Sequence, residues 1–323
     1  MADWKVVGQE AAVRLLKGAI ARHRLCHAYL FVGPPGCGKT TLARALAKAL
    51  NCESTDPPCQ SCGICKRIER GEDFDVREIG PDEGGASVQI EQVREFEHQA
   101  SLTGIGAGYK IGIVPHAELL TEEAANAFLK TLEEPPPRTV IVLATPSRDA
   151  IAATVVSRCV TIQLSPVTRR DIADLLREAG ELGQEDGELI LDYADGRAGW
   201  AIEMAQDTGK LQNLIEAVAG MEAMLAGDAI ARLDWVEEAA PDRAAALELL
   251  DTLGRYHGVR ARSILREAAE KGRRSDPSWR GFGPWARNLE RIRAAQDALA
   301  ANTMVRATLE AMVLDLEMLP GIT

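Results

Sequence analysis

The chain has no long hydrophobic run, few aromatic residues and no excess of positive charge, and each absence excludes a class of protein. None of its apolar stretches approaches the roughly 20 residues that cross a bilayer, so we expect no membrane-spanning segment. Aromatic residues make up only 4% of the 323 residues, so stacking platforms for single-stranded nucleic acid are not expected. The formal net charge of -11 excludes binding of nucleic acid by bulk electrostatics, because that binding requires a surplus of Lys and Arg. Any contact with DNA must therefore be local or shared with partner proteins.

An export signal is also missing. The first residues, Met1 to Lys5, lack the basic region and apolar stretch of a secretory signal, so we expect a cytoplasmic location. Of the seven cysteines, four fall within one short segment, which in a reducing compartment favours a metal site over disulfides. The length of 323 residues exceeds what one hydrophobic core usually supports, so two or three domains are expected.

The first half of the chain alternates short β-rich runs with helical patterns, which predicts a mostly parallel, three-layer α/β sheet with its ligand at the carboxyl ends of the strands. The predicted strands are Tyr29–Val32, Val76–Ile79, Lys110–Val114, Val140–Ala144 and Val160–Leu164. The predicted helices are Glu10–Arg22, Thr40–Leu50, Glu91–Ala100 and Glu122–Glu134, the last with Thr121 as its N-cap. After Ser165 the strand signal disappears. We expect a small helical domain over about 168–207, followed by a bundle of amphipathic helices.

The segment from Gly33 to Thr40 matches the phosphate-binding loop pattern G-x-x-x-x-G-K-[ST], and it lies between a predicted strand and a predicted helix. Its backbone N–H groups can surround phosphates, Lys39 can reach the β- and γ-phosphates, and the Thr40 hydroxyl can ligate Mg²⁺. We therefore predict a site for ATP or ADP with Mg²⁺; the alternative is a relic loop retained for folding. The predicted nucleotide-binding residues are Gly33, Pro34, Gly36, Cys37, Gly38, Lys39, Thr40 and Thr41. Cys37 is interpreted as a small filler, although loop donors could also lower its pKa.

The acidic residues that usually accompany such a loop are missing. After the strand Lys110–Val114, where an Asp should hold Mg²⁺ and a second group should activate water, the sequence has Pro115 and His116. Glu118 follows two residues later and could compensate only through an unusual backbone path. Because general-base catalysis contributes about 10²–10⁴-fold, we expect marginal hydrolysis. The alternative is a rewired but active site.

Four cysteines form a candidate metal site in an insertion at about residues 51–66. Their spacing is C-x₆-C-x₂-C-x₂-C, which suits tetrahedral Zn²⁺ and leaves no open coordination position, so the site is predicted to be structural. The predicted ligands are Cys52, Cys59, Cys62 and Cys65. An iron–sulfur cluster and disulfides are the alternatives.

Two arginine features have ordinary explanations when each is considered alone. Arg158, in Ser157-Arg158-Cys159 before the last predicted strand, resembles a helix-capping or ion-pairing residue. The segment from Arg260 to Arg293 contains many Arg residues together with Trp279 and Trp285. Its flanking helices and acids favour a packed connection between helices over a DNA-binding platform.

Considered together, the motifs resemble the bacterial DNA polymerase III clamp-loader subunits of the AAA+ class. The resemblance is dense in the first half and weaker in the second. It implies three parts: an AAA+ P-loop domain at 1–165, a helical lid at 166–208 and an all-α collar at 209–323. The segments that carry it are Val7-Gly8-Gln9, His27 to Pro34, the four cysteines, Glu123 to Pro136, and Ser157-Arg158-Cys159.

The resemblance also implies a role for Arg158. In that family the Ser-Arg-Cys arginine acts in trans, on a nucleotide bound by a neighbouring subunit of a ring. The motor subunits of the family, gamma and tau, keep the acidic motif and an Arg in the lid, where this chain has Gly199. Both departures favour a stator, which supplies the arginine and helps to load the sliding clamp on primed DNA with gamma/tau and delta as partners. A gamma/tau-like motor and a free-standing AAA+ DNA-remodelling ATPase are the alternatives.

Overall fold

The computed structural model describes residues 3–82, 85–101, 108–180, 183–240, 242–270, 279–317 and 319. The chain divides into two compact units. The first comprises Met1–Leu182 with Ala194–Glu203, and the second comprises Gly183–Tyr193 with Met204–Thr323. The first unit contains the α/β sheet, and the second is helical in the residues that the structure describes.

The first unit contains a parallel sheet of five strands within the described residues. The strand order is β2-β3-β4-β1-β5, and each neighbouring pair is parallel. Every predicted strand is present, with ends that differ from the prediction by at most one residue. The strands are β1 (Ala28–Val32), β2 (Val76–Glu78), β3 (Lys110–Val114), β4 (Thr139–Thr145) and β5 (Val160–Gln163). Because β1 and β4 are buried along their whole length, they have the near-continuous apolar sequences of a sheet covered on both faces.

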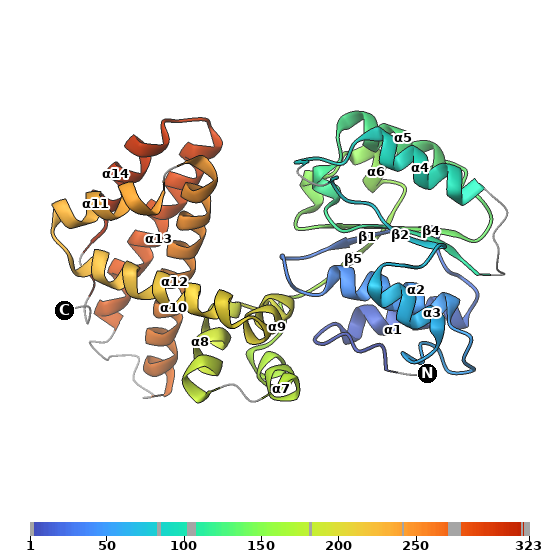
Figure 1. The fold of residues 1–323 in the computed structure, drawn as a ribbon, viewed down its shortest axis with the longest axis horizontal. Coiled ribbons are helices and arrows are strands. Elements are labelled where there is room, and N and C mark those ends of the chain that lie inside the picture. Colours follow the sequence, from blue (N-terminus) through green and yellow to red (C-terminus); the bar gives the residue numbers. More distant parts are fainter. Residues whose placement is uncertain are drawn as a thin grey trace. The chain divides into compact units, whose positions relative to one another are not determined.

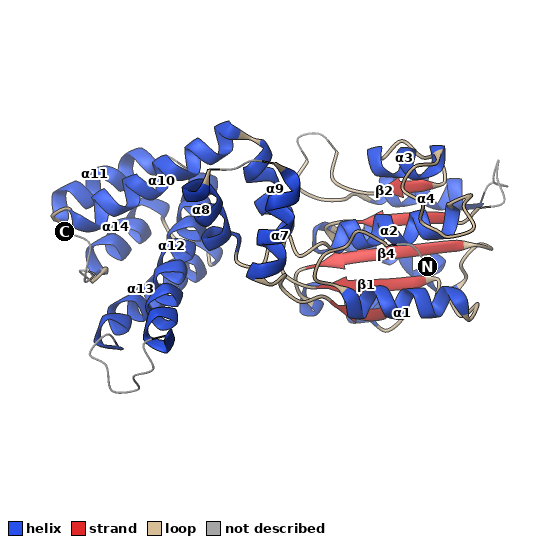
Figure 2. Cartoon of the chain, turned by 90° about the horizontal axis from the view of Figure 1, so that it is seen from below, coloured by secondary structure: helices blue, strands red, loops and turns tan. Residues whose placement is uncertain are grey.

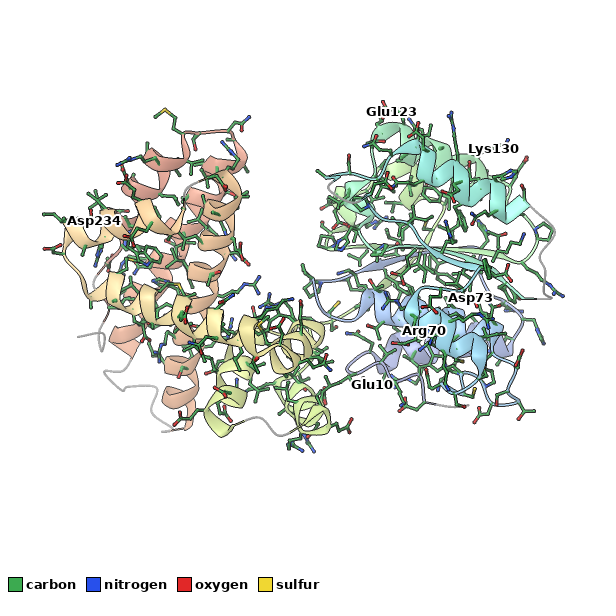
Figure 3. The ribbon with its side chains drawn as sticks, in the orientation of Figure 1. Glu10, Arg70, Asp73, Glu123, Lys130 and Asp234 are labelled. Carbon is green, nitrogen blue, oxygen red and sulfur yellow. The ribbon has the colours of Figure 1, made fainter. Side chains whose placement is uncertain are left out.

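Helices cover both faces of the sheet, which makes three layers (Figures 1 and 2). One face carries α1 (Glu10–Ala21), α2 (Lys39–Asn51) and α3 (Gly63–Arg70). The opposite face carries α4 (Ile90–Ser101), α5 (Glu122–Glu133) and the short α6 (Ala153–Val156). Two separate hydrophobic clusters fill the spaces between the sheet and these helices. Glu123 and Lys130 lie on the outer side of α5, away from the sheet (Figure 3).

Local chemistry explains where these elements begin and how closely they pack. Thr121 is the N-cap of α5, as predicted, and its hydroxyl accepts a hydrogen bond from the Ala124 N–H at 3.2 Å. Gly112 of β3 lies under Phe96 of α4, where an added Cβ would be 2.6 Å from the ring. Only glycine therefore lets this helix pack so closely on the strand, and the sequence alone gives no indication of the contact.

The rest of the described chain is helical, and the predicted end of the strand region near Ser165 is confirmed. Trp285 is buried against the rings of Tyr256 and His257, as expected for a packed connection; residues 271–278 and the side chain of Trp279 lie outside the described part. Among the helices of the described residues, none combines the length and apolar character that crossing a bilayer requires. The helices are α7 (Arg169–Ala179), α8 (Gln184–Ala194), α9 (Ala198–Gln206), α10 (Thr208–Ala226), α11 (Ala229–Ala239), α12 (Arg243–Glu270), α13 (Trp279–Ala300) and α14 (Val305–Asp315).

Candidate nucleotide and metal sites

The predicted phosphate-binding loop joins β1 to α2 at the carboxyl edge of the sheet. Gly36 and Gly38 have φ angles of 73° and 96°, left-handed conformations that L-residues with side chains rarely adopt. The loop is tied to the neighbouring strand because the Gly33 N–H donates to the Thr145 carbonyl at 3.1 Å. Thr40 lies half-buried in the first turn of α2, whereas Thr41 is exposed. The loop therefore has the backbone path and the helix N-terminus that phosphate binding requires.

Lys39 folds back over this loop. Its amine donates to the carbonyl oxygens of Gly33 at 2.7 Å and Pro34 at 2.9 Å. Burial lowers the pKa of Lys39, while the neighbouring Cys37 and Glu118 groups oppose that lowering. The amine is thus held inside the loop, in the position from which a lysine reaches phosphate oxygens.

Cys37 behaves as a filler and not as a reactive thiol. Its side chain is fully buried, and burial raises the pKa of the thiol instead of lowering it. An added Cβ on Gly33 would be 3.0 Å from the Cys37 sulfur, so the two residues pack tightly. The alternative of a low-pKa thiol in the loop is wrong, because desolvation outweighs the effect of the loop donors.

The end of β3 differs from our expectation in one respect. Pro115 and His116 follow the strand as read from the sequence, and His116 points largely into solvent, with 64% of its side chain exposed. A short 3₁₀ helix, η1 (Ala117–Leu119), then turns Glu118 inward, so that only 22% of its side chain is exposed. The 3₁₀ turn is the unusual backbone path that compensation by Glu118 requires, and it brings this acid close enough to influence Lys39.

The start of α9 packs directly on the phosphate-binding loop. The Gly199 N–H donates to the Gly36 carbonyl at 3.2 Å, and an added Cβ on Gly36 would lie 2.7 Å from the Cβ of Arg197. The Arg197 guanidinium lies 4.9 Å from the centre of the Trp200 ring. Gly199, which stands where the motor subunits have an Arg, was singled out from the sequence, but the contact of Arg197 with the loop was not predicted. The position of Arg197 directly after Gly196 is the one feature of the sequence that could have indicated it.

Gln9 is a second residue that sequence reasoning did not place. It is buried, and its side-chain amide donates to the Cys37 carbonyl at 3.0 Å and to the Ser165 carbonyl at 2.7 Å. Its side-chain oxygen accepts from the Ser165 N–H at 3.3 Å. One side chain thus joins the start of the chain, the phosphate-binding loop and the end of the sheet.

The four predicted metal ligands lie together. The sulfur atoms of Cys52, Cys59, Cys62 and Cys65 are all within 4.8 Å of one another. The Cys52 sulfur accepts hydrogen bonds from the backbone N–H groups of Ser54 and Cys59, at 3.4 and 3.3 Å. Hydrogen bonds from the backbone and side chain of Ser61 lower the pKa of Cys59 to about 6. These donors stabilise the thiolate of Cys59, the form that binds metal, whereas burial raises the pKa of Cys65 to about 12. Four sulfur ligands at this spacing fit tetrahedral Zn²⁺.

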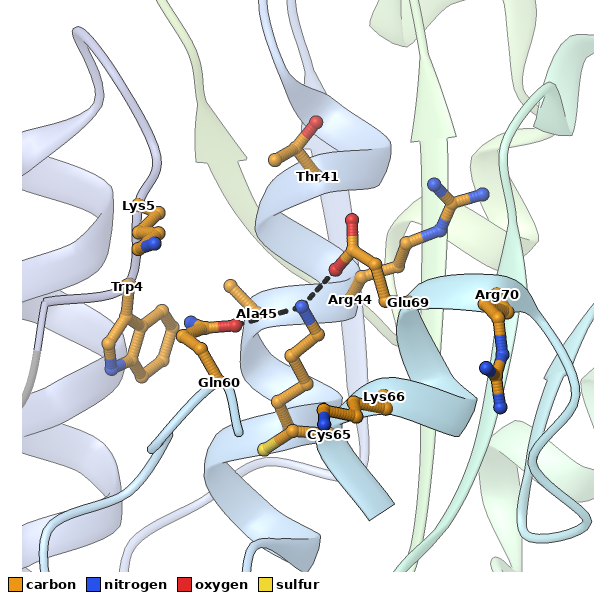
Figure 4. A pocket seen from close by; sticks show the side chains of 11 residues that line it. Trp4, Lys5, Thr41, Arg44, Ala45, Gln60, Cys65, Lys66, Glu69 and Arg70 are labelled. Carbon is orange, nitrogen blue, oxygen red and sulfur yellow. Dashed lines mark hydrogen bonds and ion pairs between the residues drawn. The ribbon is translucent and has the colours of Figure 1, made fainter. Parts of the chain in front are cut away.

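A hollow of about 430 Å³ separates this insertion from α2 (Figure 4). Its rim is rich in cations, but most of them have acidic partners. Lys48 is buried and pairs with Glu69, and it also donates to the side chain of Gln60 at 3.0 Å. Arg44 pairs with Glu78. Lys48 therefore joins the cysteine-containing insertion to the helix that begins at the phosphate-binding loop.

Arg158 lies between α6 and β5, at the opposite end of the sheet from the phosphate-binding loop. Its side chain is 34% exposed, and its Nε donates to the Glu133 carboxylate at 3.0 Å. A second nitrogen donates to the Thr154 carbonyl at 2.8 Å. The ordinary capping and ion-pairing contacts expected from the sequence are both present, and they hold the guanidinium in one orientation at the surface.

The family model that matches this chain and two of its curated relatives are described as subunits of DNA polymerase III. Residues 8–168 match the family model described as "DNA polymerase III, delta subunit". The chain is 36% identical over 198 residues to DNA polymerase III subunit tau of Bacillus subtilis, an alignment that covers 59% of this chain and 35% of that protein. It is 39% identical over 179 residues to DNA polymerase III subunit delta' of the same organism, covering 54% of each. The chain thus spans about half the length, or less, of the curated relatives it matches.

A solved structure confirms the fold class. The crystal structure of a DNA polymerase III gamma subunit-related protein from Thermotoga maritima superposes with a TM-score of 0.50 at 19% identity, covering 95% of this chain and 97% of that one. At this identity the similarity establishes the fold alone: a parallel α/β domain followed by helices.

Proposed function

Since the chain is a member of the clamp-loader family of AAA+ proteins, we propose that it acts as a delta-prime-like stator of the DNA polymerase III clamp loader. In this role it supplies Arg158 to a nucleotide site on a neighbouring subunit and helps to load the sliding clamp on primed DNA. The proposed partners are the gamma/tau and delta subunits in a hetero-oligomeric ring.

The observation that carries this proposal is the position of Arg158 relative to the chain's own phosphate-binding loop. In the parallel register Val160 pairs with Tyr29, near the start of β1, whereas the loop follows Val32 at the end of β1. Arg158 precedes β5 and therefore lies at the amino edge of the sheet. The length of β1, about 16 Å at ~3.3 Å per residue, separates the two edges. An arginine in this position is suited to a nucleotide on another subunit and not to its own.

The local contacts of Arg158 support the same role. Glu133 and the Thr154 carbonyl fix the guanidinium while a third of the side chain stays exposed. An arginine finger needs this combination, because a preorganised cation loses little conformational freedom when it meets the developing charge of a transferred phosphoryl group.

We also propose that the chain binds ATP or ADP with Mg²⁺ and hydrolyses it poorly. The left-handed glycines, Lys39 and Thr40 supply the phosphate and metal contacts, and Mg²⁺ would neutralise phosphate charge there. Pro115 cannot serve as an acid or base, and His116 is directed to solvent. Neither of the two residues that directly follow β3 is therefore positioned to activate water.

We propose that the insertion at about 51–66 holds one structural Zn²⁺ through its four cysteines. Four thiolates would complete the coordination of the metal, so it would stabilise the insertion and take no part in phosphate chemistry. Within the family architecture, we assign 1–165 to the AAA+ domain, 166–208 to the lid and 209–323 to the collar that joins subunits.

The decisive experiment replaces Arg158 by Ala in a reconstituted clamp loader. The isolated variant should fold and assemble normally, because the side chain is partly exposed and surface ion pairs contribute only about 0–1 kcal/mol. DNA-stimulated ATP hydrolysis and clamp loading should decrease. An isolated site loses about 10³–10⁵-fold without its arginine finger, and intact sites elsewhere in a ring reduce the overall loss.

The matched control is Arg177→Ala, which removes an arginine that is 72% exposed and pairs with Asp174. It should leave both activities unchanged. If the Arg158 variant assembles and equals wild type in both assays, the arginine is structural and the stator proposal is wrong.

A gamma/tau-like motor is the second candidate, favoured by the similarity to tau and by the inward turn of Glu118. Steady-state hydrolysis of ATP by the isolated chain separates the two. Turnover comparable with that of a motor subunit would support the motor, and negligible turnover would support the stator.

A further inference from the structure

Glu118 has one carboxylate oxygen that the described protein groups leave unsatisfied. Its Oε1 lies 3.3 Å from Nδ1 of His116. Its Oε2 is buried and has no hydrogen-bond partner in the part of the chain that the structure describes. A buried acceptor without a hydrogen-bond partner destabilises the folded protein by about 1–3 kcal/mol, and by more when it is charged. Such an atom therefore commonly marks a bound water, an ion or a functional site.

The location of Glu118 in the sheet indicates which ligand could satisfy this oxygen. Glu118 lies in η1, directly after β3 and therefore at the same carboxyl edge of the sheet as the phosphate-binding loop. The charge of Glu118 raises the pKa of Lys39, which partly opposes the larger lowering caused by burial. The Lys39 amine itself donates hydrogen bonds to two loop carbonyls. Glu118 thus stands at the edge of the sheet where phosphates and their metal would bind.

The neighbouring side chains do not account for it. His116 contacts the other oxygen and is itself 64% exposed, so it does not satisfy Oε2. Pro115 has neither charge nor N–H. A divalent cation with its water ligands would supply the missing positive charge and the missing donor together, since Mg²⁺ keeps several waters when it binds a nucleotide.

We propose that Glu118 is the carboxylate that faces Mg²⁺ in this nucleotide site, in place of the acid missing at Pro115 and His116. The inference rests on the proposed binding of ATP or ADP and adds a positioning residue for the metal. It also separates two roles that are usually combined after β3: the chain retains a carboxylate for the metal but lacks a base for water. Metal-dependent binding with little hydrolysis follows.

The test measures the affinity of the full chain for ATP and ADP by calorimetry, in Mg²⁺ and in EDTA. Wild type should bind more tightly in Mg²⁺, and Glu118→Gln should lose a factor of about 10 to 100 of that affinity, the value of a hydrogen bond to a charged group. Affinity in EDTA should change little. The control is Glu123→Gln, which removes the same charge from the outer side of α5 (Figure 3) and should behave as wild type.

Each outcome is decisive. If Glu118→Gln keeps the full effect of Mg²⁺, or if Glu123→Gln loses as much, Glu118 has no metal-facing role, and nucleotide binding itself still stands. If wild type binds ATP equally well with and without Mg²⁺, the inference fails without any variant, so misfolding of the variant cannot protect it. If wild type binds neither nucleotide, both the inference and the proposed nucleotide site are wrong.

Discussion

His257 is fully buried in the C-terminal unit, and its protonation should determine how this unit responds to acid. Its Nδ1 donates to the Leu253 carbonyl at 2.9 Å, and its Nε2 lies 3.4 Å from the Asn288 amide nitrogen, a donor. This pattern suits a neutral ring with its proton on Nδ1. The rings of Tyr256 and Trp285 pack edge-on against it at 5.6 and 5.3 Å between centres. A protonated His257 would therefore be a buried cation without an acidic partner among the described residues.

The size and direction of the effect follow from the pKa. Burial lowers the pKa of His257 from 6.5 to about 4, while its bond to the Leu253 carbonyl opposes the shift. Between these values the unfolded chain binds a proton that the folded chain does not, so the free energy of unfolding falls as the pH falls from about 6.5 to 4. The difference of 2.5 pKa units corresponds to roughly 3 kcal/mol, a large fraction of the stability of a typical domain.

Urea unfolding at pH 7.5 and pH 4.5 measures this effect. Carboxylates also titrate in that range, so the informative quantity is the difference between wild type and His257→Gln. The variant should be less stable at pH 7.5 because packing is lost, but it should lose about 2–3 kcal/mol less than wild type on acidification. His98→Gln, which removes an exposed histidine of α4, should follow wild type. Equal losses for wild type and His257→Gln would refute the reasoning, as would an NMR titration that places the pKa of His257 near 6.5.

Three further outcomes are expected. Purified protein should contain one equivalent of zinc by metal analysis, and Cys62→Ser should lose most of it. Cys26→Ser, which lies outside the cluster, should keep its zinc. Iron with visible absorbance in the wild type would contradict a zinc site. Lys39→Ala should abolish ATP binding in calorimetry while the circular dichroism spectrum is retained, and unchanged affinity would mean that the loop is a relic. Gly36→Ala should destabilise the first unit by about 1–3 kcal/mol in thermal unfolding, because the φ of 73° and the clash with Arg197 both oppose a side chain; an unchanged melting temperature would argue against this packing.

Local sequence patterns predicted most of the helices and strands of the first unit. Every predicted strand was found, because buried parallel strands leave apolar runs bounded by Gly, Pro and polar residues. The prediction for α5 succeeded at its first residue because Thr121 is an N-cap with a local mechanism. The strand order could not be predicted, because it depends on pairings between segments far apart in the chain. Gly112 is an example: its need for glycine comes from Phe96, sixteen residues earlier.

The residues of the candidate sites also separate into those predictable from local motifs and those that depend on distant contacts. The left-handed glycines of the loop and the proximity of the four cysteines follow from contiguous motifs, in which the spacing along the chain sets the local geometry; binding of nucleotide and of zinc there remains a prediction. Glu118 was underestimated because a 3₁₀ turn, invisible in the composition, directs it inward. Arg197 and Gln9 were missed because their contacts with Gly36 and Cys37 depend on how distant segments pack. The roles of Arg158 and the divisions at residues 165 and 208 remain predictions.

The placement of the phosphate-binding loop and Arg158 at opposite edges of one parallel sheet also restricts the symmetry of any assembly. Because the arginine and the loop lie at opposite edges, a head-to-tail contact brings the arginine of one subunit to the loop of the next, whereas a two-fold dimer would have to include both edges in a single contact. Head-to-tail contacts either close into a ring or continue into a filament. In the proposed role, a subunit that supplies its arginine but turns over little nucleotide of its own would stand at one end of such an arrangement and would give the assembly a defined first member and a direction.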